Sequence, residues 1–218
     1  MSERKKIAVL ISGRGSNMAS LISASMDPSY PAEIALVISN KPGAAGLERA
    51  AEFGIETATV DHTEFSGDRQ AFERALDEKL KARGIEFVAL AGFMRLLSSW
   101  FVTQWRDRVI NIHPALLPSF KGLHTHERAL EEGVKLHGAT VHFVSAEMDD
   151  GPIIIQGAVP VLEDDTPDTL GERVLAVEHK IYPKALALVA SGRAKVKDHR
   201  VAIAGEDTEQ AGPVLIWP

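Results

Sequence analysis

The sequence has 218 residues, of which 45% are hydrophobic and 25% are charged, and its formal net charge is −6. These values are typical of a globular protein with one large domain or two small ones, and they exclude collagen-like and disordered classes. The sequence contains no cysteine, which excludes a disulfide framework, a thiolate metal site and a cysteine nucleophile. Because the charge is negative, we expect no nucleic-acid partner.

The N-terminal segment is basic and then apolar, as a signal peptide would be. Its apolar run, Ile7–Ile11, is much shorter than the apolar region of a signal peptide. No apolar stretch approaches the roughly 18–20 residues that a membrane span requires. The sequence therefore predicts a cytoplasmic protein with no membrane association.

Short apolar runs alternate with longer amphipathic segments along the first half of the chain. The apolar runs predict strands at Lys6–Ser12, Glu33–Ser39, Ile55–Val60, Glu86–Ala91 and Arg108–Ile112. The amphipathic segments predict helices at Ser16–Ala24, Ala44–Phe53 and Asp68–Arg83, with Gly54 and Gly84 ending the last two. This alternation predicts an α/β fold with a mostly parallel, twisted, Rossmann-like sheet and helices on both of its faces.

The second half of the chain has a different pattern. Gly138–Ser145 and Pro152–Pro160 read as strands joined by a short turn, so we expect an antiparallel portion of the sheet here. Thr166–Ala190 has a helical pattern in which Pro183 is expected to kink or split the helix. Two further runs, Val196–Ala204 and Pro213–Pro218, resemble a peripheral hairpin or tail.

The domain organisation follows from the absence of repeats and of low-complexity linkers. We expect a single domain over residues 1–192, with residues 193–218 forming a hairpin or tail packed on it.

The glycine-containing segment SGRGSN, Ser12–Asn17, lies between the first predicted strand and the first predicted helix. A turn of this kind presents free backbone N–H groups and the positive end of a helix dipole, which suit a phosphate group. The segment lacks the third glycine of a dinucleotide fingerprint and the Gly-Lys-Ser/Thr of a Walker loop, so it indicates neither NAD nor ATP. The alternative is an ordinary strand-to-helix turn with Ser16 or Asn17 as the N-cap.

Asn111 and His113 lie two residues apart at the end of the fifth predicted strand. Alternate side chains of a strand share a face, so both point the same way, at the sheet edge where ligands bind in such folds. An amide can donate to a developing oxyanion, and an imidazole can transfer a proton. The alternative is a structural histidine at a strand end.

Asp149 and Asp150 occupy a turn, where acidic residues are often only solvated turn formers. A carboxylate that instead reached His113 would favour the imidazolium and orient the ring. His124 and His126, separated by one residue, would share a face of an extended segment and resemble two metal ligands. Because no third ligand has suitable spacing and cysteine is absent, we expect no metal. Together with His137, these two histidines are expected to contact an anionic or heteroaromatic ligand or to be ordinary polar surface.

Six segments in register resemble one family. They are SGRGSN, SNKPGAAGLERA, LAGFMRLLS, NIHPALLPSFKGLHTH, HGATVHFV and MDDGPIIIQ, and they extend from about Ile7 to about Gly192. This pattern closely resembles the folate-dependent phosphoribosylglycinamide formyltransferases of purine synthesis. The resemblance implies a catalytic domain over residues 1–192; the sequence leaves open whether the protein is a monomer or a homodimer. It also implies formyl transfer from 10-formyltetrahydrofolate to the amine of glycinamide ribonucleotide, with no metal and no ATP.

The resemblance also assigns roles to residues. It implies that Asn111 and His113 stabilise the tetrahedral oxyanion, that His113 handles the proton going to the folate nitrogen, and that Asp149 favours the protonated histidine and relays a proton through water. The implied ribonucleotide-binding residues are Gly15, Ser16, Asn17, Glu178 and, as an additional phosphate contact, Lys121. The implied folate-binding residues are Arg69, Met94, Arg95, Leu96, Leu97 and Asn111.

Two related enzymes and one binding function are alternatives. Formyltetrahydrofolate deformylase carries a preceding regulatory domain and methionyl-tRNA formyltransferase a following tRNA-binding domain, and we expect neither because the first strand starts at Lys6 and the chain is short and acidic. A phosphate-ligand-binding module without catalysis would not need Asn111, His113 and Asp149 together. Arg14 adds a positive charge beside the phosphate turn and is expected to help binding or to be neutral.

Overall fold

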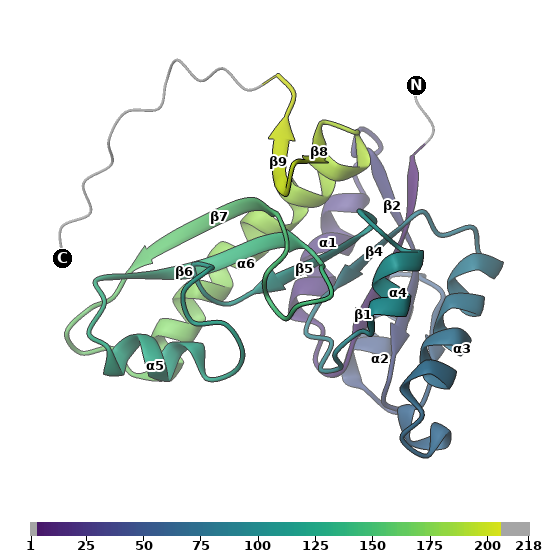
Figure 1. The fold of residues 1–218 in the computed structure, drawn as a ribbon, viewed down its shortest axis with the longest axis horizontal. Coiled ribbons are helices and arrows are strands. Elements are labelled where there is room, and N and C mark those ends of the chain that lie inside the picture. The colour runs from purple at the N-terminus through teal and green to yellow at the C-terminus, as the bar shows by residue number, and fades with distance from the viewer. Residues whose placement is uncertain (1–3, 206–218) are drawn as a thin grey trace.

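Helices and strands alternate along the chain in the computed structural model, which describes residues 4–205 (Figure 1). The strands are β1 (Lys5–Ile11), β2 (Ala32–Ser39), β3 (Thr57–Thr59), β4 (Phe87–Leu90), β5 (Val109–His113), β6 (Leu136–Phe143), β7 (Ile153–Pro160), β8 (Ala194–Lys197) and β9 (Arg200–Ile203). The helices are α1 (Ser16–Ser25), α2 (Ala45–Glu52), α3 (Arg69–Ala82), α4 (Ser99–Gln104), α5 (Thr125–Glu131) and α6 (Pro167–Ala190), with a 3-10 turn η1 at His62–Phe65.

Seven of the strands form one sheet in the order β3-β2-β1-β4-β5-β6-β7. The pairs from β3 to β5 are parallel, and the β5–β6 and β6–β7 pairs are antiparallel. The predicted fold class, a mostly parallel Rossmann-like sheet with an antiparallel portion in the C-terminal half, is therefore confirmed. Strand order reverses between β1 and β4, which is where open α/β sheets bind ligands.

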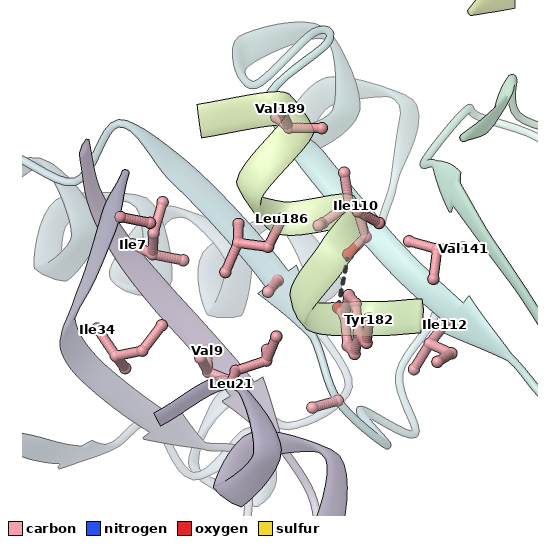
Figure 2. Packing of buried hydrophobic residues seen from close by; sticks show 14 of the residues in the cluster. Ile7, Val9, Leu21, Ile34, Ile110, Ile112, Val141, Tyr182, Leu186 and Val189 are labelled. Carbon is pink, nitrogen blue, oxygen red and sulfur yellow. Dashed lines mark hydrogen bonds between the residues drawn. The ribbon is translucent and has the colours of Figure 1, made fainter. Parts of the chain in front are cut away.

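β1 is buried on both faces, as its continuous apolar sequence predicts. Its odd-numbered side chains, such as Ile7 and Val9, pack under α1 and α6, together with Leu21 and Leu186 (Figure 2). Its even-numbered side chains, Ala8 and Leu10, join the opposite core, under α3 and α4. The two packed faces hold β1 rigidly, so the turn that follows it has a fixed position.

The long helix α6 packs across the middle of the sheet and reaches both halves of it. The hydroxyl of the fully buried Tyr182 donates to the backbone oxygen of Leu90 at 2.8 Å and to that of Ile110 at 3.4 Å, the second contact being drawn in Figure 2. These contacts tie the helix to β4 and β5, the two strands that end at the candidate site. A third apolar cluster packs α5 and the start of α6 against β6 and β7.

The structure differs from the sequence interpretation in three details. α6, predicted over Thr166–Ala190, is one helix from Pro167 to Ala190, so Pro183 does not split it; its apolar face is packed before and after the proline. A hairpin lies within Ala194–Ile203 and turns at Asp198 and His199, both at positive φ, so Val196–Ala204 is not one continuous strand. The run Pro213–Pro218 lies outside the described residues. The short helices α4 and α5 were not predicted.

None of the helices in the described part of the chain has both the length and the apolar character that a membrane crossing needs.

Candidate active site

A cavity of about 300 Å³ lies where β1 and β4 end, at the point where strand order reverses. It is lined by residues of the glycine turn and of the segment after β4: Ser12, Gly13, Arg14, Gly15, Ser16, Asn17, Ala91, Gly92 and Met94. Leu90 pairs in register with Asn111 of β5. The end of β5 is therefore next to the cavity, on the same edge of the sheet.

Gly15 determines the shape of the glycine turn, which the sequence predicts to bind a phosphate group. It is the N-cap of α1 and has a φ of 69°, in the left-handed region that favours glycine. A Cβ atom here would lie 3.1 Å from Met18 and 3.2 Å from Gly46 on the adjoining helix α2. No side chain caps α1, so the N-cap alternative for Ser16 or Asn17 is wrong. The first N–H groups of the helix therefore remain available to an anion at the cavity.

Glu178 of α6 contacts this turn from the other side. Its carboxylate accepts a hydrogen bond from Asn17 Nδ2 at 2.6 Å, and the side chain is buried. Burial raises the pKa of Glu178, and the Asn17 contact only partly offsets that effect. The structure thus brings Glu178 together with Asn17, two of the predicted ribonucleotide-binding residues.

The segment after β4 is fixed at both ends. Ser12 Oγ accepts from Met94 N at 2.8 Å, and Ser12 N donates to Gly92 O at 3.1 Å. At the other end, the fully buried carboxylate of Glu73 accepts from Ser98 N at 2.6 Å and from the Ser98 hydroxyl. Sequence reasoning missed this clamp, although Ser12 precedes the glycine turn directly.

His113 and Asp149 meet at the end of β5, 36 positions apart in the sequence. His113 Nδ1 lies 3.5 Å from Asp149 Oδ2, and both side chains are almost completely buried. His113 Nε2 lies 2.9 Å from Phe120 O. Both ring nitrogens therefore face oxygen acceptors, and the imidazolium is the form that donates to both. Such a pair can act as a general acid and base.

The turn that carries Asp149 is shaped by backbone contacts. Asp149 has a φ of 52°, which is uncommon for a residue with a side chain, and Gly122 N donates to its carboxylate at 2.9 Å. Gly151 has no space for a Cβ atom, which would lie 1.7 Å from Phe143 O. Lys121 forms an ion pair with Asp150, so this second aspartate faces the loop lysine while Asp149 faces His113.

The other histidines do not form the arrangement suggested by the His-x-His spacing. His124 occupies the N-cap position of α5 without a capping side-chain hydrogen bond and is exposed, whereas His126 lies within α5, with its Nδ1 3.1 Å from Nε2 of the buried His137. The expectation of an extended segment is wrong because Thr125–Glu131 is helical. Residues 4–205 contain no group of three or more His, Asp or Glu side chains that could hold a metal ion.

The remaining predicted site residues are farther from the cavity or more exposed. Met94 lines the cavity but is 67% exposed. The other predicted folate-side and phosphate-side residues do not line it in the described part of the chain: Arg69, Arg95, Leu96, Leu97 and Lys121.

Two buried residues of β6 that sequence reasoning missed support the end of β5. His142 lies opposite Asn111 and Thr140 opposite His113 in the antiparallel register. The Thr140 hydroxyl accepts from Leu117 N at 3.0 Å and donates to Ala115 O at 2.7 Å, which holds the loop after His113. The signal for both was the alternation of polar side chains along β6.

A family model described as formyl transferase matches residues 5–186. The chain belongs to the formyl transferase family. The match confirms the resemblance found from the sequence motifs, and it covers the glycine turn, Asn111, His113 and Asp149.

Individual family members are similar over nearly the whole chain. Phosphoribosylglycinamide formyltransferase of Escherichia coli is 44% identical over 200 residues, covering 92% of this chain and 94% of that protein. The trifunctional purine biosynthetic protein adenosine-3 of Bos taurus is 48% identical over 206 residues, and the chain spans 20% of its length. The crystal structure of glycinamide ribonucleotide transformylase 1 from Symbiobacterium toebii has a TM-score of 0.90 at 46% identity, covering 93% of this chain and 95% of that one.

Proposed function

We propose that this protein transfers the formyl group of 10-formyltetrahydrofolate to the amine of glycinamide ribonucleotide, in purine synthesis. One observation carries the proposal: the His113–Asp149 pair and Asn111 lie on the same sheet edge as a helix N-terminus with uncapped N–H groups. This edge supplies an acid–base pair and an anion site. Formyl transfer to the amine of a substrate that also carries a phosphate group requires both. The similarity to named phosphoribosylglycinamide formyltransferases supports the choice of substrate.

The ribonucleotide phosphate is proposed to bind at the start of α1. Gly15, Ser16 and Asn17 contribute the helix N-terminal N–H groups, which attract anions. Glu178 orients Asn17 and contacts the substrate, and Lys121 is an additional phosphate contact in this proposal. The local positive potential of the helix end allows an acidic protein to bind a phosphate.

The chemistry at β5 is proposed to be direct transfer. The amine nitrogen attacks the formyl carbon, a C–N bond forms, and the carbonyl electrons move to oxygen. Asn111 donates to this oxyanion, and His113 does so once its Nε2–H group exchanges Phe120 O for the oxyanion. The intermediate then collapses: the bond from the formyl carbon to the folate nitrogen breaks, and that nitrogen takes a proton from His113. The ammonium group formed by the attack loses one proton through water to Asp149, so no net acid or base is consumed.

The folate is proposed to bind along the clamped segment after β4. The exposed apolar side chains of Met94 and Leu96, with Leu97, suit a flat heteroaromatic ring, and Arg95 and Arg69 supply positive charge toward its acidic end. The clamp by Ser12 and Glu73 holds this segment in place before the folate arrives. Asn111 completes the folate side of the reaction centre. A resident metal and ATP have no role in the proposed reaction.

Several expectations stay predictions. They are the oligomeric state (monomer or homodimer), the cytoplasmic location, the absence of nucleic-acid and membrane partners, and the catalytic domain over residues 1–192.

Formyl transfer measured directly tests the proposal. The protein is mixed with 10-formyltetrahydrofolate, with and without glycinamide ribonucleotide and with no metal or ATP added, and release of free tetrahydrofolate is followed by absorbance. Release that requires the ribonucleotide is the expected result. Release without it would indicate the hydrolytic deformylase reaction. No release with either mixture would contradict the proposal and favour the binding module without catalysis.

A further inference from the structure

His142 is a buried histidine whose tautomer is determined by its neighbours. It is 2% exposed, and its Nδ1 lies 2.9 Å from Phe143 O. A carbonyl oxygen only accepts hydrogen bonds, so Nδ1 carries the proton. In the neutral ring, Nε2 is then an acceptor with a free lone pair.

That lone pair faces the side-chain amide of Asn111. His142 Nε2 and Asn111 Nδ2 are 3.3 Å apart, and the two residues are paired in the β5–β6 register. Because Nε2 accepts, the amide presents its nitrogen to His142 and its oxygen elsewhere. This is the one side-chain hydrogen bond of Asn111 within residues 4–205, so its second N–H group is uncommitted.

We propose that His142 is a positioning residue for the reaction: its Nε2 fixes the amide of Asn111 so that the second N–H group faces the oxyanion of the tetrahedral intermediate. The proposal rests on the proposed formyl transfer. Asn111 donates one N–H group to the oxyanion and the other to His142 Nε2, and His142 Nδ1 in turn donates to Phe143 O. Without the acceptor, the amide is free to turn and present its oxygen to the oxyanion, which repels it.

The arrangement requires a neutral His142. Burial lowers the pKa of His142 and keeps the ring neutral; the nearby charged groups are Asp149 and Asp150, which act against this shift, and His113, which acts with it. Protonation would put a second N–H donor opposite Asn111 Nδ2 and break the contact. Acid pH should therefore lower kcat through His142.

Two substitutions test whether the hydrogen-bond acceptor at Nε2 of His142 matters independently of the other atoms of the ring. The longer amide side chain introduced by His142→Gln reaches the position of Nε2 and can accept from Asn111, whereas the shorter one introduced by His142→Asn reaches only the position of Nδ1. We expect His142→Asn to lower kcat by about 10- to 100-fold with both KM values nearly unchanged, in the range found for loss of an oxyanion donor or less. His142→Gln should stay within about fivefold of the wild type and lose the acid-side decline due to His142. His199→Asn, in the exposed β8–β9 turn, is the control. Equal losses in both His142 variants, an unchanged His142→Asn, or a loss expressed only in KM would overturn the proposal.

The unmodified protein provides a test that does not depend on a variant folding or on activity. Nitrogen-15 NMR of the imidazole rings distinguishes a protonated from an unprotonated ring nitrogen. At neutral pH we expect His142 to have a protonated Nδ1 and an unprotonated Nε2. A proton on Nε2 would overturn the proposed positioning even if formyl transfer is observed, whereas absence of transfer with the expected tautomer would count against the proposed function alone.

Discussion

The two halves of the sheet bring different chemical groups to the same edge. In the parallel half, the groups at the cavity belong mainly to the backbone, because Gly15 leaves the first N–H groups of α1 uncapped. Where the antiparallel half begins, at β5 and β6, the groups at this edge are side chains: the amide of Asn111, the ring of His113 and the carboxylate of Asp149. One half is built to bind an anion and the other to move protons.

The difference extends to what holds each half in place. The glycine turn is fixed by the packing of β1 between two apolar cores. The reactive side chains are fixed by polar contacts from β6 and from two loops, including those of Thr140, Gly122 and Phe120. Substitutions in the parallel half should therefore change ribonucleotide binding, whereas substitutions in the antiparallel half should change turnover.

The largest expected effect is on the His113–Asp149 pair. His113→Ala or Asp149→Ala should lower kcat by about 10²- to 10⁴-fold, the range that acid–base catalysis contributes, while substrate binding is largely kept. The measurement is steady-state kinetics together with ribonucleotide binding by calorimetry. Wild-type turnover in either variant would contradict the assigned roles.

Arg14 tests the binding half. Within residues 4–205 it is the one charged side chain that lines the cavity, so it adds positive charge to the helix N-terminus. Arg14→Asn should raise KM for the ribonucleotide by about three- to tenfold and weaken its dependence on salt, with kcat unchanged. Arg200→Asn, which removes an exposed arginine in the β8–β9 hairpin, is the matched control. A fall in kcat, or no change in KM, would contradict the assignment of binding to one half of the sheet and of turnover to the other.

Acid pH should destabilise the antiparallel half, through His137. Burial, followed by the neighbouring His126 and His113, lowers the pKa of His137 to about 4. The unfolded chain, with an ordinary histidine pKa of about 6.5, binds more protons between these values, so stability falls as pH falls from about 6.5 to 4, by up to about 1.4 kcal/mol per pH unit for one proton. Thermal unfolding at pH 7.5 and 5.0 should show a smaller loss for His137→Gln than for the wild type, and an unchanged loss for the exposed His199→Gln. Equal losses in all three proteins would exclude His137 as the cause.

The parts of the fold that are determined locally were predictable from the sequence. The buried run of β1, the glycine turn and the capped start of α6 at Pro167 depend on neighbouring residues, and each was predicted to within one or two positions. Continuous packing explains why Pro183 did not break α6, since burial of the apolar face outweighs one missing hydrogen bond.

The site was predictable only where residues are close in sequence or match a known motif. The spacing of Asn111 and His113 on one strand was enough to place them on one face. The contact with Asp149 depends on how a distant turn folds back, and the roles of His142 and Thr140 depend on strand register. Register is set by the packing of the whole sheet, so no local pattern carries it.

Glu178 is the exception within the binding half, because it is a buried charged side chain among backbone groups. Its neutral partner is Asn17, and burial raises its pKa above the ordinary value. The folded protein then holds this proton more tightly than the unfolded chain, so the contribution of Glu178 to stability declines as pH rises from the ordinary pKa through the raised one. At neutral pH the carboxylate is therefore destabilising.

Glu178→Gln keeps an oxygen for Asn17 and removes the buried charge, so it should raise stability at pH 7.5 by about 1 kcal/mol, or 2–4 °C in Tm, and show no gain at pH 4. The same variant should raise KM for the ribonucleotide, because Glu178 is proposed to contact that substrate. A lower Tm with unchanged KM would indicate that the carboxylate serves the fold and not the ligand.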